Sequence, residues 1–208
     1  MWYDLFSLFY DRALEDLYAP FRPAAVEALR LTEGARVLDL PCGTGQSFDL
    51  LVPAVGPTGA VLGVDESSGM LRRARRRADR AGWDTVSLIR ATADEVDAQR
   101  LGVAPEDADG LDGVLCALGL TALPNWEEAF DGLFALLRPG GRFVLFDVHA
   151  AERTKETRSV ELVARADLSR EAWRPLEARC ADFHREVLPA DPAQFGGDLY
   201  VASGTKAG

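Results

Sequence analysis

Short apolar runs alternate with longer helical patterns through the middle of the chain. Five runs have the composition of buried strands: residues 35–40, 59–65, 85–91, 111–118 and 141–148. Three segments between them carry apolar residues at helical spacing: 47–55, 69–82 and 125–141. Strands that alternate with helices pair in parallel and take right-handed crossovers. The pattern therefore predicts a doubly wound α/β fold, in which helices cover both faces of an open, mostly parallel sheet.

The two ends of the chain depart from this alternation. Residues 1–30 carry aromatic side chains on more than one helical face, which predicts a helical cap over the domain formed by residues 31–208. Residues 152–178 have a helical pattern, and residues 178–188 and 197–206 are expected to be two final strands. A length of 208 residues suits one domain with a sizeable core.

The charge of the chain bears on its partners. The formal net charge is -10, whereas proteins that bind nucleic acid present basic surfaces. Six arginines do lie between residues 72 and 80, but Leu71, Ala74 and Ala78 form an apolar face on the same predicted helix. We therefore expect these arginines to face solvent, and we expect no nucleic-acid partner.

Cysteine and histidine content limits the chemistry further. Cys42, Cys116 and Cys180 are widely separated and odd in number, which indicates a reducing compartment and a cytoplasmic protein. His149 and His184 are the only histidines, so we expect no metal site. No apolar run is long enough to span a bilayer, so no transmembrane segment is expected.

A glycine-rich turn comes after the first predicted strand. The sequence passes from VLDL into PCGTGQ, where Gly43 and Gly45 allow a tight turn and a close approach by a ligand. Open α/β sheets bind ligands at this position, beyond the carboxyl ends of the strands. Asp65 ends the second strand and can accept hydrogen bonds from both hydroxyls of a ribose. Together the two features predict a nucleoside cofactor.

The residues after the turn decide which nucleoside is expected. A dinucleotide fingerprint requires a third glycine where this chain has Phe48, and the chain has no P-loop lysine. The string DLPCGTG (39–45) instead resembles the first motif of class I S-adenosylmethionine-dependent methyltransferases. The resemblance extends over about residues 35–150, in the same order as the family, through four further segments: 61–71, 91–96, 112–120 and 136–147.

This resemblance implies a three-layer fold with a seven-stranded, mostly parallel sheet and an antiparallel last strand. It also implies that Asp39 and the turn hold the methionine end of S-adenosylmethionine, while Asp65 holds the ribose. The other positions carried over from the family are Pro41, Cys42, Gly43, Thr44 and Gly45 in the turn, Glu66 and Met70 beside ribose and adenine, Thr92 and Ala93 at the adenine edge, and Cys116 and Ala117 beside the methionine moiety.

Two residues differ from the family pattern. Pro41 replaces the usual first glycine of the turn, and Thr92 replaces the aspartate that usually receives the adenine amino group. The opening YDLFSLFYDRAL is similar to the start of methyltransferases that act on phospholipid amines or quinones, in which a tyrosine-bearing helix covers the cofactor. Tyr10 is the candidate for that contact.

We expect methyl transfer to an amine or hydroxyl of a small or lipid-like acceptor. Residues two apart in a strand share a face, so the exit of strand 141–148 directs Asp147 or His149 toward the mouth of the sheet. His149 is the candidate general base, and Asp147 is expected to serve stability or cofactor placement. Two alternatives stay open: a non-catalytic S-adenosylmethionine-binding protein, and a nicotinamide-dependent oxidoreductase. The acceptor and the oligomeric state are not indicated by the sequence.

Overall fold

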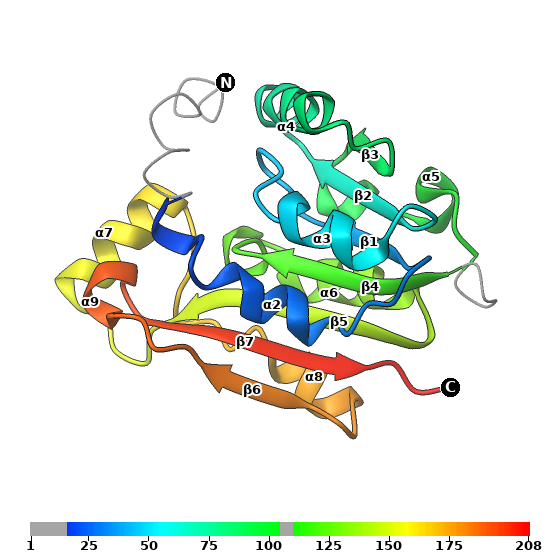
Figure 1. Ribbon diagram of the computed structural model, residues 1–208. Helices are drawn as coiled ribbons and strands as arrows, with labels where there is room; N and C mark the ends of the chain where they lie inside the picture. The colour runs from blue at the N-terminus through cyan, green and yellow to red at the C-terminus, as the bar shows by residue number, and fades with distance from the viewer. Residues whose placement is uncertain (1–15, 105–109) are drawn as a thin grey trace.

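The computed structural model describes residues 16–104 and 110–208 (Figure 1). The described strands are β1 (Arg36–Asp39), β2 (Ala60–Asp65), β3 (Val86–Arg90), β4 (Leu111–Ala117), β5 (Leu137–His149), β6 (His184–Val187) and β7 (Asp198–Thr205). The described α-helices are α2 (Arg22–Ala28), α3 (Phe48–Val55), α4 (Ser68–Ala81), α5 (Ala98–Leu101), α6 (Trp126–Ala135), α7 (Lys155–Ala164), α8 (Arg174–Arg179) and α9 (Pro192–Phe195). Short 3₁₀ helices lie at η1 (Ala93–Glu95) and η2 (Leu120–Ala122).

The strands form one seven-stranded sheet in the order β3-β2-β1-β4-β5-β7-β6. Strands β1 to β5 pair in parallel, and β7 runs antiparallel to both β5 and β6. This architecture confirms the predicted doubly wound sheet with an antiparallel last strand. It also brings the carboxyl ends of β1, β2, β4 and β5 to the same edge.

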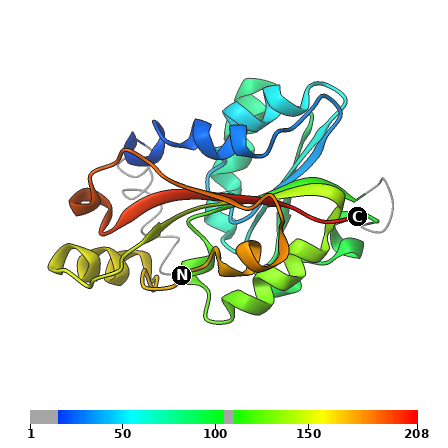
Figure 2. The same ribbon diagram turned by 90° about the horizontal axis from the view of Figure 1, so that it is seen from below.

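Apolar side chains cover both faces of the sheet. On one face Leu29, just after α2, and Phe48 of α3 pack with Val37 and Phe146 of the sheet. On the other face Phe130 of α6 joins a second cluster of buried residues that includes residues of β1, β2, β4 and β5. Figure 2 shows α2, α3 and α4 on one side of the sheet and α6 and α8 on the other, so the molecule has three layers.

Helix α4 shows how local sequence sets an element beside the site. The Ser67 side chain caps its first turn and accepts a hydrogen bond from the backbone N–H of Met70 at 3.3 Å. Gly82 ends it in the left-handed conformation at φ +68°. Ala74 and Ala78 are buried against the sheet, as the pattern predicted. The capped start of α4 places Met70 close to Asp65, at the end of β2.

Arg142 ties the antiparallel side of the sheet to the helical layer. Its buried guanidinium donates hydrogen bonds to the Ala28 carbonyl oxygen at 2.7 Å, Asp182 Oδ2 at 2.7 Å, Ser203 Oγ at 2.8 Å and Thr205 Oγ1 at 2.8 Å. A buried cation is tolerated when its donors find such partners. The bonds connect β5 to α2, to β7 and to the segment before β6.

Three predicted boundaries are wrong. The helix expected over residues 125–141 ends at Ala135, because Leu137 already pairs with Leu111 at the start of β5. Residues 152–178 form two separate helices, α7 and α8. The strand expected over residues 178–188 is limited to β6, since α8 continues to Arg179.

Residues 1–15 of the expected cap lie outside the described residues. The rest of that segment contributes Tyr18, Val26 and Leu29 to the core on the α3 side of the sheet. Within the described residues, no helix has the length and apolar character needed to cross a membrane.

Candidate functional site

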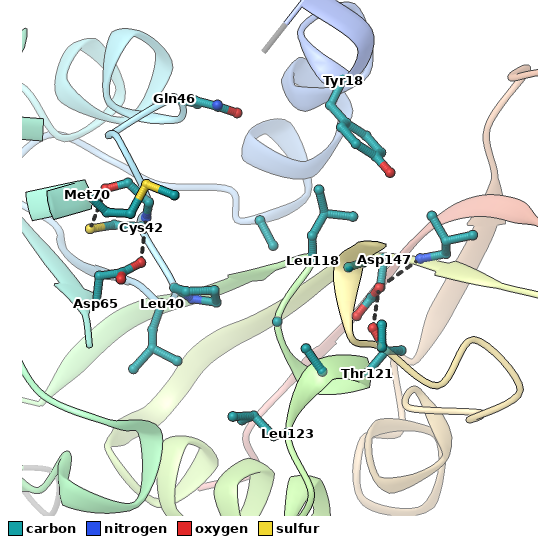
Figure 3. A pocket seen from close by; sticks show the side chains of 18 of the residues that line it. Tyr18, Leu40, Cys42, Gln46, Asp65, Met70, Leu118, Thr121, Leu123 and Asp147 are labelled. Carbon is teal, nitrogen blue, oxygen red and sulfur yellow. Dashed lines mark hydrogen bonds between the residues drawn. The ribbon is translucent and has the colours of Figure 1, made fainter. Parts of the chain in front are cut away.

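A cavity of about 550 Å³ lies at the carboxyl edge of the parallel strands (Figure 3). Its lining includes Leu40 after β1, Asp65 of β2, Ala117 of β4 and Asp147 of β5. Pockets of roughly 300–1,000 Å³ are typical of sites for small molecules and cofactors. The cavity therefore occupies the place where doubly wound sheets bind ligands.

The glycine turn forms one wall of this cavity. Gly43 and Gly45 have φ values of +54° and +78°, a region that side chains disfavour. A Cβ atom at Gly45 would lie 2.5 Å from Cδ2 of Phe48, whereas a Cβ at Gly43 would meet no atom within 4 Å. Gly45 thus permits the packing of the turn on α3, and Gly43 leaves open space beside the cavity for a ligand.

Asp65 is held rigidly beside the turn. Its Oδ2 accepts a hydrogen bond from the Gly43 N–H at 3.0 Å, and its Oδ1 accepts one from the Ser67 N–H at 2.9 Å. The residue is 8% exposed, and burial raises the pKa of its carboxyl group. Each oxygen of an ionised carboxylate can accept a second hydrogen bond. Asp65 can therefore receive two neighbouring hydroxyls from a ligand in the cavity.

The wall next to Asp65 suits a planar, partly polar group. Glu66, Met70, Thr92 and Ala93 all line the cavity on this side. The backbone N–H of Thr92 donates a hydrogen bond to Glu95 Oε2 at 3.1 Å, which fixes the start of η1. The resemblance assigns these residues to the adenine end of the cofactor.

Asp39 and Thr44 are buried polar residues whose side-chain oxygens have no hydrogen-bond partner within residues 16–104 and 110–208. Burial raises the pKa of Asp39 to about 7, although the nearby positive charge of Arg22 opposes that rise. Arg22 itself lines the cavity and donates a hydrogen bond to Ser47 Oγ at 3.1 Å. Buried polar oxygens without partners are uncommon in folded proteins. Their position beside the turn fits a ligand that carries cationic or hydrogen-bond donor groups.

The opposite end of the cavity is apolar. It is lined by side chains from segments far apart in the sequence: Leu17, Tyr18, Leu118, Leu123, Val160, Val163, Leu168 and Phe195. The rings of Tyr18 and Phe195 meet edge to face with their centroids 5.1 Å apart. Sequence reasoning missed these residues, although Tyr18 lies in the segment predicted to cover the domain.

A polar pair lies at the apolar end, where Ser159 and Gln194 also line the cavity. Asp147 Oδ1 accepts hydrogen bonds from Thr121 Oγ1 at 2.9 Å and from the Val148 N–H at 2.9 Å. Asp147 and Thr121 both line the cavity, and Figure 3 shows Asp147 on the opposite side from Asp65. Burial raises the pKa of Asp147 to about 6.

The structure brings most of the predicted cofactor residues to one cavity. Its lining includes ten of them: Pro41, Cys42, Gly43, Thr44, Asp65, Glu66, Met70, Thr92, Ala93 and Ala117. Three others are not among its lining residues: Asp39, Gly45 and Cys116. Tyr10 lies outside the described residues. No cluster of three or more potential metal ligands occurs among residues 16–104 and 110–208.

His149 is not placed at the cavity. Its ring meets Trp173 edge to face with centroids 4.7 Å apart, and it is not among the residues that line the cavity. Burial and the charge of Arg185 lower the pKa of His149. The strand alternation predicted that Asp147 and His149 share a face, but only Asp147 reaches the cavity, because Trp173 covers the position of His149.

A glycine turn after β1 and an acid at the end of β2 lie together at the edge of the sheet where doubly wound folds bind their ligands. The sequence matches the profile of a family described as a methyltransferase domain over residues 31–181. The chain therefore belongs to this methyltransferase family.

Individual relatives agree with the family. The chain is 28% identical over 131 residues to a demethylmenaquinone methyltransferase of Listeria welshimeri, a match that covers 63% of this chain and 52% of the relative. It is 32% identical over 143 residues to a 2-phytyl-1,4-naphtoquinone methyltransferase of Thermosynechococcus vestitus, covering 69% and 59%. These matches span little more than half the length of the curated relatives.

A solved structure shows the same fold. The crystal structure of a SAM-dependent methyltransferase from Aquifex aeolicus superimposes with a TM-score of 0.60 at 19% sequence identity. The superposition covers 90% of this chain and 91% of that one. The shared architecture therefore extends beyond the residues that the sequence matches cover.

Proposed function

We propose that this protein binds S-adenosylmethionine and transfers its methyl group to an amine or hydroxyl of a small or lipid-like acceptor. One observation carries the proposal: a single cavity joins the Gly43 and Asp65 wall to an apolar end that contains one carboxylate, Asp147. Such a cavity can hold a nucleoside and a second, less polar molecule side by side. The names of the quinone methyltransferases among the relatives support a lipid-like acceptor.

The residues of the turn and of β2 would hold the cofactor. Asp65 would accept both ribose hydroxyls, while Met70 and Thr92 would lie beside the adenine. The buried oxygens of Asp39 and Thr44 have the chemistry to face the charged methionine end. When bound, S-adenosylmethionine supplies a methyl group on a sulfonium, which is a good leaving group.

The chain would contribute mainly by positioning the acceptor. The apolar end can hold an acceptor in line with the methyl group. Alignment of this kind can supply roughly 7–11 kcal/mol of the barrier reduction.

Binding and turnover experiments test the proposal in two steps. Calorimetry should show binding of S-adenosylmethionine and no comparable binding of NAD. Incubation with a panel that includes 1,4-naphthohydroquinone and primary amines should then release S-adenosylhomocysteine. Absence of S-adenosylmethionine binding would contradict the proposal. Binding without turnover on any acceptor would favour the non-catalytic alternative.

The substitution Thr92→Asp tests the adenine end. If Thr92 meets the adenine amino group, the variant should bind S-adenosylmethionine more tightly, because a charged acceptor forms a hydrogen bond about twice as strong as a neutral one. A gain of about 1 kcal/mol corresponds to roughly five-fold in the dissociation constant. Thr92→Asn, a neutral side chain of similar size, is the matched control and should show a smaller gain. Equal or weaker binding in Thr92→Asp would place the adenine elsewhere.

A further inference from the structure

Asp147 is buried, yet one oxygen of its carboxylate has no hydrogen-bond partner among the described residues. The residue is 1% exposed and lines the cavity at the end of β5. Its Oδ1 is occupied by Thr121 and by the Val148 N–H, whereas its Oδ2 has no hydrogen-bond partner among the described residues. Leaving a buried carboxylate oxygen without a partner is costly, so a group that donates a hydrogen bond to it gains stabilisation.

Among residues 16–104 and 110–208, no positive charge contributes to the shift in the pKa of Asp147. Two titratable side chains of the described residues interact electrostatically with it, Cys116 of β4 and Tyr200 of β7, and burial raises the pKa of both. Arg185 of β6 lies over the Tyr200 ring, 5.0 Å from its centroid, and its charge is not among the influences on Asp147. Asp147 therefore meets neutral neighbours at pH 7 and can take up a proton.

From this geometry we infer that Asp147 accepts the proton of an acidic hydroxyl on the acceptor, and that the acceptor is an apolar ring compound carrying such a hydroxyl. The inference rests on the proposed function. The surrounding apolar lining suits a ring, and Oδ2 is the one unpartnered carboxylate oxygen among the described residues that line this end. Thr121 acts as a positioning residue, since its hydroxyl holds Oδ1.

The chemical step balances without any further reactant. The O–H bond of the acceptor breaks, and its proton moves to Oδ2 of Asp147. The electron pair left on the acceptor forms a bond to the methyl carbon, while the carbon–sulfur bond breaks and its pair stays on sulfur. If a ring carbon receives the methyl group, the hydrogen of that carbon moves to the ring oxygen by tautomerisation. Asp147 then releases its proton to water.

The variant Asp147→Asn is the direct test. Asparagine keeps an oxygen that can accept from Thr121 and from the Val148 N–H, so the fold is expected to be retained. Because positioned general bases contribute on the order of 10²–10⁴-fold, turnover of 1,4-naphthohydroquinone should fall within that range. Affinity for S-adenosylmethionine, measured by calorimetry, should be unchanged. Asp198→Asn, which changes an exposed acid on the adjacent strand β7, is the matched control and should keep full turnover.

The pH profile of the unmodified protein gives a second, independent readout. Since burial raises the pKa of Asp147 to about 6, kcat/KM should rise with pH, reach half of its maximum near pH 6 and level off above that. This limb should be absent in Asp147→Asn. The blocked analogue 1,4-dimethoxynaphthalene, which has no hydroxyl proton, should not be methylated.

Each outcome separates this inference from the proposed function. Full turnover by Asp147→Asn, or the same acid limb in the variant and the unmodified protein, would overturn the role of Asp147 while methyl transfer stands. If His149→Ala loses turnover while Asp147→Asn keeps full turnover, the general base is the imidazole of His149 and not Asp147. Loss of S-adenosylmethionine affinity in Asp147→Asn would overturn the inference by assigning Oδ2 to the cofactor. Absence of methyl transfer from the unmodified protein would instead contradict the proposed function.

Discussion

Replacing Asp65 with alanine is expected to weaken S-adenosylmethionine binding by ten- to a hundred-fold. The carboxylate is rigidly placed by the Gly43 and Ser67 N–H groups and faces the cavity. Hydrogen bonds to a charged group contribute about 1.5–3 kcal/mol, and each 1.4 kcal/mol is about ten-fold in affinity. Calorimetry on the purified variant measures the loss directly.

Two controls make that result specific. Asp84→Ala removes an exposed acid just beyond α4 and should leave binding unchanged. Thermal unfolding of Asp65→Ala should show whether loss of the bond to Gly43 disturbs the turn as well as the ribose contact. Unchanged cofactor affinity in a folded Asp65→Ala protein would mean that the ribose lies elsewhere.

Replacing Asp39 with asparagine is expected to remove a pH-dependent loss of stability. Burial raises the pKa of Asp39 to about 7 from an ordinary value of 3.8, so the folded state prefers the protonated carboxyl. A group with a raised pKa in the folded state destabilises the fold as pH rises from the unfolded value through the folded one. A shift of about three pH units in the pKa corresponds to a loss of about 4 kcal/mol in the free energy of unfolding once the pH exceeds both pKa values. Asp39→Asn stays neutral and should avoid this loss.

Urea unfolding between pH 4 and pH 8 checks this prediction. The free energies of unfolding of Asp39→Asn and the unmodified protein should be similar near pH 4, and the variant should be the more stable above pH 7. For the control variant Asp84→Asn, at an exposed position, the free energy of unfolding should differ from that of the unmodified protein by an amount that does not change with pH. A difference between Asp39→Asn and the unmodified protein that does not change with pH would show that Asp39 stays ionised.

The sheet could be predicted because its signals are local. The strand at β1, the turn at Gly43 and Gly45, and the acid at Asp65 come one after another within about thirty residues. The end of α6 was harder to predict from the sequence, because Leu136 and Leu137 continue the helical spacing of its apolar residues. The pairing of Leu137 with Leu111 ends the helix, and that contact is set by the tertiary structure.

The acceptor end of the cavity could not be predicted for a related reason. Tyr18, Val160 and Phe195 come from three segments whose relative positions depend on how α7 and α9 pack. Alternation along β5 correctly put Asp147 and His149 on one face. It could not show that Trp173, a residue preceding α8, covers His149 and leaves Asp147 at the cavity.

The position of β7 has a consequence for synthesis of the protein on the ribosome. This strand lies between β5 and β6, yet about 50 residues separate its start from the end of β5. At a synthesis rate of about 5–20 residues per second, roughly 2–10 s pass between the synthesis of β5 and that of its partner β7. Throughout that time an apolar edge is open to pairing with another nascent chain, which is the usual hazard of an unpaired strand. Chaperone demand during translation should therefore be concentrated between the emergence of β5 and that of β7.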